Sequence, residues 1–366
     1  MLVEYYFPQS ISPARLDRYL SGGWFRSGPS LFRTQVLCLE GGVFPVVNIR
    51  TQLEGYTFSK SLRKILRKND ERFRVEVGMA SVDAAKESLY AQHKHRFKGF
   101  IFETLEEFLF SGEIGDLFDT WEVRVYDQLE LIAVSYFDRG KGSLASLLGL
   151  FHPAYESFSV GLYTMLKEVQ YGIEAGFKFY YPGYILKDFS GFDYKLRLGH
   201  QQYYNWKGKW RKMDRLSEEL FALDKIQYSI ENVLIHLDAL GIHYQVLYYP
   251  FFAMGYLEMI EEDFLRSVIY IKLDHAKRAF DPNLQMVIEY VIEEDLFYLS
   301  WVRPNHDYVD MMNAEFSENF FKGQVVDEGM LVRDHLLCME DSASAVVSKA
   351  ARFIHEEDTF ITGSWL

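Results

Sequence analysis

The sequence predicts an α+β protein in which a mixed sheet with helices is preceded by a small N-terminal domain and followed by an acidic α+β extension. Three observations support this prediction. An apolar strand, a helix and a second apolar strand follow one another between Gly142 and Lys195. Two more strands precede them at residues 121–126 and 129–137, and the charge balance changes sign after residue 213.

The strand–helix–strand stretch is the part around which the rest of the chain is organised. Residues 144–151 and 177–185 are apolar runs, and residues 159–175 repeat apolar side chains at helical spacing. Gly176 is placed to end that helix. Strands this apolar are expected to be buried on both faces. Gly161 at the helix entrance would let backbone N–H groups approach a polar ligand, although many α/β proteins carry the same unit and bind nothing there.

Composition excludes several classes of protein. The 366 residues suffice for two or three domains, and an aromatic content of 17% argues against disorder. Residues 1–8 lack the charged and then apolar form of a signal peptide. The most apolar run, residues 244–260, contains polar and helix-breaking residues, so no membrane span is expected. Cys38 and Cys338 have no metal or redox spacing. We expect a cytoplasmic protein.

The net charge of −13 is unevenly distributed along the chain. Residues 1–213 contain 28 Lys and Arg against 24 Asp and Glu, whereas residues 214–366 contain 11 against 28. This shift marks a domain boundary, and we expect an N-terminal domain over 1–84, a central domain over 85–213 and an acidic domain after them. The negative charge of the whole chain argues against a polyanionic partner, but the balance of about +4 in residues 1–213 does not.

Residues 59–69 show the clearest charge pattern. Leu62, Ile65 and Leu66 share one face of the predicted helix. The opposite face carries five cations, Lys60, Arg63, Lys64, Arg67 and Lys68. Such a face could dock phosphates, and it could equally be an ordinary solvated surface.

Two other patterns are weaker. Residues 83–100 predict a helix in which His93 and His95 point to different sides, so a metal pair is not expected. Gly140 to Ser143 resembles a phosphate loop only superficially, because an upstream glycine is missing and strands flank both sides. Residues 203–213 interleave tyrosine and tryptophan with lysine and arginine, which suits a single-stranded nucleic acid end or an ordinary surface hairpin.

The acidic third part contains no motif that we can assign. We expect a helix over 216–240 and two terminal helices near 328–339 and 342–354. We also expect three strands, at 268–273, 284–292 and 296–302.

Five segments, in this order, resemble motifs of the aminoacyl-tRNA–protein transferase family, the arginyl- and leucyl-transferases of the N-degron pathway. They are EYYFP (4–8), SKSLRKILRKN (59–69), WEVRVYDQLELIAVSYFD (121–138), LASLLGLFHPAYESFSVGLYTMLKEV (144–169) and FYYPGYILKDFSGFDYK (179–195). The resemblance covers the first 213 residues. It implies a GNAT-like fold for residues 85–213 and the transfer of Arg or Leu from charged tRNA to the N-terminal amine of an acceptor protein.

The resemblance also implies a set of site residues. Tyr184, Tyr194 and Lys195 would line the reacting centre, where tyrosine hydroxyls hold the amine or ester oxygen and Lys195 pairs an acidic N-terminal side chain. Each tyrosine could equally be structural. The basic helix at 59–69 would hold the acceptor stem. Further substrate or tRNA contacts are expected at Arg124, His152, Val160, Gly161 and Tyr163, with the backbone N–H groups of Val160 and Gly161 facing the ester or terminal adenosine.

The chain departs from the family pattern at several positions. The N-terminal cysteines that hold a cluster or other metal in the family are missing, with Glu4 at the first position, so we expect no metal and no cofactor. The aspartate of the family's turn is His152, the arginine before its Ser-Leu-Gly motif is Phe158, and a Lys-Met pair is replaced by Gly191 and Phe192.

Two alternatives therefore stay open. A GNAT-type acyltransferase using acetyl-CoA would share the fold, but its usual pyrophosphate loop is not seen at 156–161. A non-catalytic descendant would use the acidic part as a protein-binding or autoinhibitory module.

Overall fold

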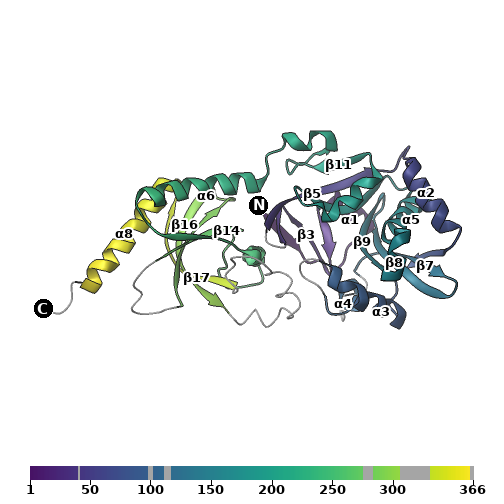
Figure 1. The fold of residues 1–366 in the computed structure, drawn as a ribbon, viewed down its shortest axis with the longest axis horizontal. Helices are drawn as coiled ribbons and strands as arrows, with labels where there is room; N and C mark the ends of the chain where they lie inside the picture. The colour runs from purple at the N-terminus through teal and green to yellow at the C-terminus, as the bar shows by residue number, and fades with distance from the viewer. Residues whose placement is uncertain (40–41, 98–101, 111–116, 275–282, 306–329, 363–366) are drawn as a thin grey trace. The chain divides into compact units, whose positions relative to one another are not determined.

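The computed structural model describes residues 1–39, 42–97, 102–110, 117–274, 283–305 and 330–362 (Figure 1). The chain divides into two compact units. One contains residues 5–33 and 46–219, and the other contains residues 1–4, 34–45 and 220–366. This division differs from the three domains expected from the sequence, because the basic helix shares a core with the central strands instead of forming part of a separate N-terminal domain.

The first half of the chain alternates short strands and helices. In order, its elements are β1 (Val3–Tyr6), α1 (Pro13–Ser21), β2 (Phe25–Ser27), β3 (Ser30–Thr34), β4 (Val36–Leu39), β5 (Gly42–Gln52), α2 (Lys60–Asp70), β6 (Arg74–Met79), α3 (Ala84–His93) and α4 (Leu105–Phe110). Side chains cap these helices: Ser12, Ser59 and Asp83 accept backbone N–H groups at the starts of α1, α2 and α3. The expected helix at 83–100 ends at His93, and its last residues, 98–100, lie outside the described part.

The central stretch forms the expected strand–helix–strand unit. Its elements are β7 (Thr120–Asp127), β8 (Glu130–Arg139), β9 (Ser143–Phe151), the 3-10 helix η3 (Pro153–Phe158), α5 (Val160–Glu174), β10 (Phe179–Leu186), the 3-10 helix η4 (Ser190–Leu198), β11 (Gln201–Tyr204), β12 (Trp210–Lys212) and the 3-10 helix η5 (Met213–Glu218). Gly176 adopts the left-handed backbone (φ +77°) that ends α5, as its position predicts.

These strands build one nine-stranded mixed sheet in the order β12-β11-β5-β10-β9-β8-β7-β6, with β4 paired to β5. Only β9 and β10 run parallel among the described pairs. Alternating side chains divide the two faces: Leu144 and Tyr180 pack in the core beneath α5 and α2, while Ala145 and Tyr181 pack against α1 on the opposite face. The α+β class with a large mixed sheet is confirmed.

The strands β1, β3 and β2 form a small sheet of their own, and the acidic part forms a separate five-stranded sheet. Its elements are α6 (Ala222–Ala239), β13 (Tyr244–Tyr248), the 3-10 helix η6 (Pro250–Tyr256), β14 (Ile269–Leu273), β15 (Gln285–Val291), β16 (Leu296–Asn305), β17 (Met330–Glu340) and α8 (Ala343–Thr362). The strands pair antiparallel in sequence order, and α6 and α8 contact each other and the sheet. Among the described helices, none combines the length and the apolar composition needed to cross a membrane.

One secondary-structure prediction for this sheet is wrong. The helix expected over 328–339 is strand β17, which begins at Met330; residues 328–329 lie outside the described part. Pairing with β16 over its whole length, from Phe297 with Glu340 to Asn305 with Met330, supplies the backbone hydrogen bonds that a helix would have satisfied internally. That partner is distant in sequence, so a local apolar pattern could not reveal it.

Candidate functional site

The two parallel strands of the central unit separate part of the way along. Strands β9 and β10 pair from Phe179 to Tyr181, and beyond that point each keeps only its other neighbour, β8 or β5. Pro182 cannot donate a ladder hydrogen bond, and Gly183 adopts φ +90°, a backbone conformation that strongly favours glycine. These two residues explain why the strands part, and the gap between them is the centre of the candidate site.

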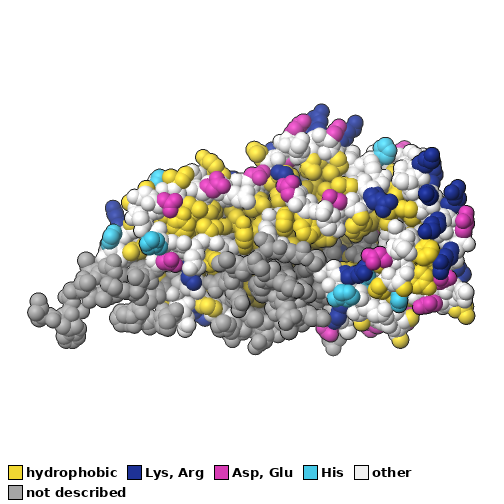
Figure 2. Space-filling model, viewed as in Figure 1, with side chains coloured by type: hydrophobic (Ala, Val, Ile, Leu, Met, Phe, Trp, Pro, Cys, Tyr) yellow, Lys and Arg dark blue, Asp and Glu magenta, His cyan; other side chains and the backbone are white. Residues whose placement is uncertain are grey.

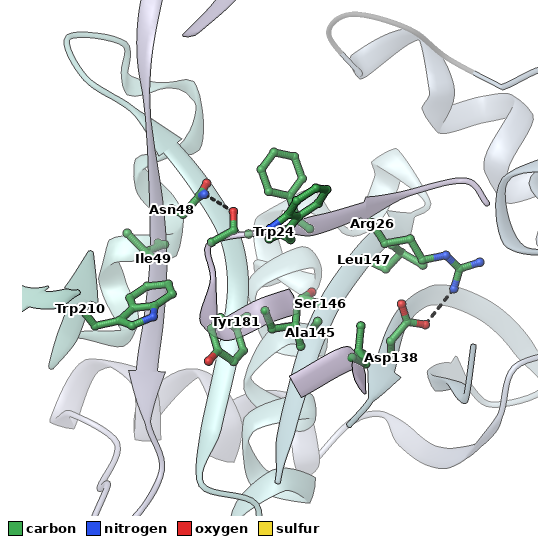
Figure 3. A pocket seen from close by; sticks show the side chains of 15 residues that line it. Trp24, Arg26, Asn48, Ile49, Asp138, Ala145, Ser146, Leu147, Tyr181 and Trp210 are labelled. Atoms are coloured by element: carbon green, nitrogen blue, oxygen red, sulfur yellow. Dashed lines mark hydrogen bonds and ion pairs between the residues drawn. The ribbon is translucent and has the colours of Figure 1, made fainter. Parts of the chain in front are cut away.

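A pocket opens at this gap on the α1 face of the sheet (Figure 3). Its cavity volume is about 20 Å³, within an open depression of about 420 Å³ that includes the solvent at its mouth. The lining is mostly apolar and aromatic: Leu16, Leu20, Trp24, Phe25, Ile49, Ala145, Leu147, Tyr181 and Trp210. Ser146 and Gly183 line it where the two strands diverge.

The polar lining residues of the pocket are largely engaged already. Asp138 accepts hydrogen bonds from Arg26 Nη1 at 2.8 Å and from Thr120 Oγ1 at 2.7 Å, and Figure 3 shows the Arg26–Asp138 pair at one side of the pocket. Asn48 donates to the Gly23 carbonyl, but its Oδ1 has no hydrogen-bond partner among the described residues.

Lys195 lies beside the same gap. Its ammonium group donates to the Tyr184 carbonyl at 2.8 Å and lies 5.1, 5.0 and 6.0 Å from the ring centres of Tyr184, Phe192 and Tyr194. A Cβ added to Gly183 would stand 3.4 Å from Nζ. Within the described residues, Lys195 forms no ion pair, and burial lowers the pKa of its amine to about 7. The three predicted centre residues are thus brought together.

The basic helix α2 adjoins the entrance of α5. Leu62 is fully buried and anchors α2, while the five predicted cations are exposed. Figure 2 shows Lys and Arg side chains gathered over the region where Figure 1 places α2. At the end of this helix, Lys68 lies 4.6 Å from the ring centre of Phe158, and Asn69 donates to the Phe158 carbonyl at 3.0 Å. The cationic face therefore lies next to the first turn of α5.

The entrance of α5 is built tightly. Ser159 has a left-handed backbone (φ 55°), and its side chain does not cap the helix. Val160 is fully buried, whereas Gly161 is partly exposed. A Cβ added to Gly161 would come within 3.1 Å of the Phe151 ring, which explains the glycine. His152 Nδ1 accepts the Ala154 N–H at 3.2 Å, which caps η3.

Two predicted contact residues have structural surroundings instead. Tyr163 is fully buried and donates to Asp70 at 2.6 Å, so its side chain ties α5 to α2 and does not reach the gap. Arg124 lies on β7, separated from β9 by β8, where it pairs with Glu76 and Glu122 at 3.4 and 3.2 Å. The structure does not bring Arg124 to the other candidate residues.

The aromatic side chains at 203–213 also pack largely inward. Tyr203 and Tyr204 are buried, and Trp210 lies over the Arg50 guanidinium at 4.4 Å and lines the pocket. Gly142 in the rejected phosphate loop donates to an Asp17 carboxylate oxygen at 2.8 Å, so that loop already holds an internal anion.

Sequence reasoning missed one residue at the gap, Glu168 on α5. It is fully buried, and Tyr180 Oη donates to its Oε2 at 2.7 Å. An acidic residue among the apolar positions of a buried helix was the signal that could have revealed it. Among the described residues, no three His, Cys, Asp or Glu side chains are grouped so that they could hold a metal ion.

Comparisons with known proteins point to one family. Residues 79–205 match the family model described as arginine-tRNA-protein transferase, C terminus. An aspartate/glutamate leucyltransferase of Leptospira interrogans serovar copenhageni is 26% identical over 199 residues, which cover 53% of this chain and 76% of that protein. An enzyme of the same name from Helicobacter hepaticus is 26% identical over 203 residues, covering 54% and 82%.

Solved structures give a weaker similarity. The structure of L-PGS from Bacillus licheniformis is 14% identical with a TM-score of 0.31, and covers 48% of this chain and 51% of that one.

Proposed function

The chain belongs to the arginyl/leucyl-tRNA–protein transferase family, and we propose that it moves an amino acid from a charged tRNA to the N-terminal amine of an acceptor protein. The aminoacyl ester is already activated, and an α-amine with a pKa of about 8 is partly neutral near neutral pH. Holding the two reactants together therefore supplies much of the required rate acceleration. We assign this role to the gap between β9 and β10.

The observation that carries the proposal is the buried Lys195 ammonium beside the gap, which has no acidic partner among the described residues. A buried cation is stabilised when a carboxylate pairs with it, and an acceptor protein that begins with Asp or Glu brings one. The names of the related enzymes specify the same acceptor residues. Tyr184 and Tyr194 enclose this ammonium and are assigned to orient the acceptor.

The tRNA is assigned to the α2 and α5 side of the gap, away from the Lys195 ammonium. The exposed cations of α2 would contact acceptor-stem phosphates. The adjacent entrance of α5, where Gly161 is partly exposed, would present its backbone N–H group to the terminal adenosine, with the ester further along α5 at the gap. In this arrangement, α5 connects the site for the tRNA phosphates with the reacting centre. The distance from Val160 to Glu168 along α5 is about 12 Å, given a rise of about 1.5 Å per residue.

The pocket supports leucine over arginine as the amino acid that is transferred. Its lining is mostly apolar, and the carboxylate among the lining residues, Asp138, already binds Arg26 and Thr120. An arginyl side chain would lose its water there without gaining a free carboxylate, whereas a leucyl side chain would bury apolar surface.

A transfer assay tests this function. The full chain is mixed with tRNA charged with labelled leucine or arginine and with peptides that begin with Asp, Glu or Ala. We expect leucine to reach the Asp and Glu peptides. The Lys195→Met variant should lower that transfer by about 10–100-fold, because a hydrogen bond to a charged group contributes about 1.5–3 kcal/mol.

The matched control is Lys178→Met, which alters an exposed lysine outside the gap and should leave transfer unchanged. Absence of transfer from any charged tRNA would overturn the proposed function. If acetyl-CoA then raised the melting temperature, we would conclude that the chain is a GNAT-type acyltransferase. A ligand that binds only the folded state stabilises that state, so a raised melting temperature reports binding. If tRNA bound and neither reaction occurred, the chain would be a non-catalytic descendant.

A further inference from the structure

The transfer reaction needs a group that takes up a proton, and the three centre residues are poorly suited to this task. Burial raises the pKa of Tyr184 to about 12, and burial together with the charge of Glu168 raises that of Tyr194 to about 12, so both stay protonated near neutral pH. Lys195 is assigned to a carboxylate, and a bound carboxylate would hold it in the protonated form. Another group must accept the proton.

Glu168 is placed to do so. It is fully buried on α5, its Oε2 accepts the Tyr180 hydroxyl at 2.7 Å, and its Oε1 has no hydrogen-bond partner among the described residues. The Ser146 hydroxyl on β9 lies close enough to this carboxyl to stabilise its charge. Because Ser146 also lines the pocket, it connects the Glu168 carboxyl with the space assigned to the substrate.

The groups around Glu168 leave its charge unpaired. The titratable side chains that face it are Tyr180 from β10 and Tyr194 from η4, and Ser135 approaches from β8. None of the described Lys, Arg or His side chains forms an ion pair with it. Burial raises the pKa of its carboxyl to about 7, against the opposing effect of the neighbouring hydroxyls. A base whose pKa lies near the working pH is the most effective kind.

A purely structural role would not require this carboxyl. The amide oxygen of a glutamine could accept the Tyr180 hydroxyl equally well, without the cost of burying an ionisable group that has one free oxygen. The feature that a glutamine could not reproduce is the uptake of a proton.

We propose that Glu168 is the proton acceptor of the transfer reaction, an inference that rests on the proposed function. The acceptor amine nitrogen attacks the carbonyl carbon of the aminoacyl ester and forms the new C–N bond, while its proton passes through the Ser146 hydroxyl to Glu168. The bond between that carbon and the ribose oxygen then breaks, and the proton passes to the ribose oxygen. Glu168 ends the reaction ionised, as it began.

The test compares the full-length protein with its Glu168→Gln variant in single-turnover transfer of labelled leucine to an Asp peptide, from about pH 5.5 to pH 9. In the wild type, both the amine and Glu168 must lose a proton, so the logarithm of the rate should rise with a slope of about two below pH 7. The variant should show a slope of about one and a rate lowered by about 10²–10⁴-fold at pH 8. Its affinity for tRNA should be unchanged.

Two further variants keep the test decisive. Glu174→Gln, at an exposed position of the same helix, should leave rate and slope unchanged. Tyr180→Phe removes the donor to Oε2, so it should raise the pKa of Glu168 and move the acidic limb to higher pH. Suppose that the wild type transfers normally. If Glu168→Gln then keeps the wild-type rate and pH slope, or if Tyr180→Phe leaves the acidic limb of the pH–rate profile in place, this inference is overturned and the proposed function is not. Wild-type protein that transfers nothing overturns the proposed function, and this inference with it.

Discussion

Glu289 and Glu168, a fully buried glutamate from each unit, have opposite surroundings. Glu289 on β15 accepts the backbone N–H groups of residues 266–267 at 3.0 and 3.1 Å and pairs with the Arg333 guanidinium. Within the described part of the chain, Glu168 accepts the Tyr180 hydroxyl through Oε2, and its Oε1 has no hydrogen-bond partner. The hydrogen-bonding capacity of the first carboxylate is satisfied by the fold, whereas the second retains an acceptor oxygen that the described residues do not fill.

The five-stranded and nine-stranded sheets differ in a similar way, because the pairing of two neighbouring strands is continuous in the first and interrupted in the second. Strands β15 and β16 pair without interruption from Gln285 to Val291, whereas the parallel pairing of β9 and β10 stops at Tyr181. A continuous ladder satisfies its backbone and leaves no space between its strands. The interrupted ladder, where Pro182 and Gly183 prevent pairing, admits a pocket and the candidate reacting residues. In this chain the candidate chemistry lies where regular structure is broken.

The largest expected effect comes from breaking the satisfied cluster. Glu289→Ala removes the fully buried partner of Arg333 and leaves the half-exposed Asp263 as its other acidic partner, and removing one member of a buried ion pair costs about 3–5 kcal/mol. We expect the unfolding transition of this unit to shift to a lower denaturant concentration. The exposed control Glu261→Ala should change stability by less than about 0.5 kcal/mol. Equal effects of the two substitutions would show that Glu289 is not held as described.

At Glu168, in contrast, we expect a substitution to increase the free energy of unfolding. Replacing it with leucine, together with Tyr180→Phe to avoid an unpaired hydroxyl, removes a buried carboxyl and should raise stability by about 1–3 kcal/mol at pH 8. Because the carboxyl pKa is raised to about 7 in the folded state, the folded wild type keeps a proton that the unfolded chain loses as pH rises from its ordinary pKa of 4.5. The stability of the wild type therefore falls as the pH rises from about 4.5 to about 7.

The gain from this double substitution should accordingly be smaller at pH 5 than at pH 8. Urea unfolding at the two pH values measures it, and transfer activity should be lost at both. A gain that does not depend on pH would contradict the raised pKa. A loss of stability at pH 8 would mean that Glu168 is satisfied by the fold in the way that Glu289 is.

Local patterns predicted much of the central unit. The strands expected at 144–151 and 177–185 and the helix at 159–175 correspond to β9, β10 and α5 within two residues at each boundary, because apolar periodicity and Gly176 are local signals. The family resemblance also named Lys195 and Tyr184, which the structure places next to each other; their role in the reaction stays a prediction. These features depend on neighbouring residues or on motifs that can be read without knowing the fold.

Other features depend on residues far apart in the sequence. The helix expected at 328–339 is a strand because its pairing partner is β16, and the wall of the pocket formed by α1 lies more than a hundred residues from β9. Glu168 was missed because a single acidic residue in an apolar helix has no significance until Tyr180 and Ser146 are known to surround it. A site formed by a break in strand pairing becomes visible only with the pairing itself.

The smallest expected effect concerns the surface cations and distinguishes two basic segments of the same unit. Lys64 on α2 and Lys209 in the turn between β11 and β12 are both exposed, but only α2 adjoins the entrance of α5. If α2 holds the acceptor stem, Lys64→Ala should weaken tRNA binding several-fold and reduce the slope of log affinity against log salt by about 0.7–0.9, the value for one lost phosphate contact. Lys209→Ala should leave the slope unchanged. Binding titrations at several salt concentrations measure both, and a reversed outcome would move the tRNA from α2 to the hairpin.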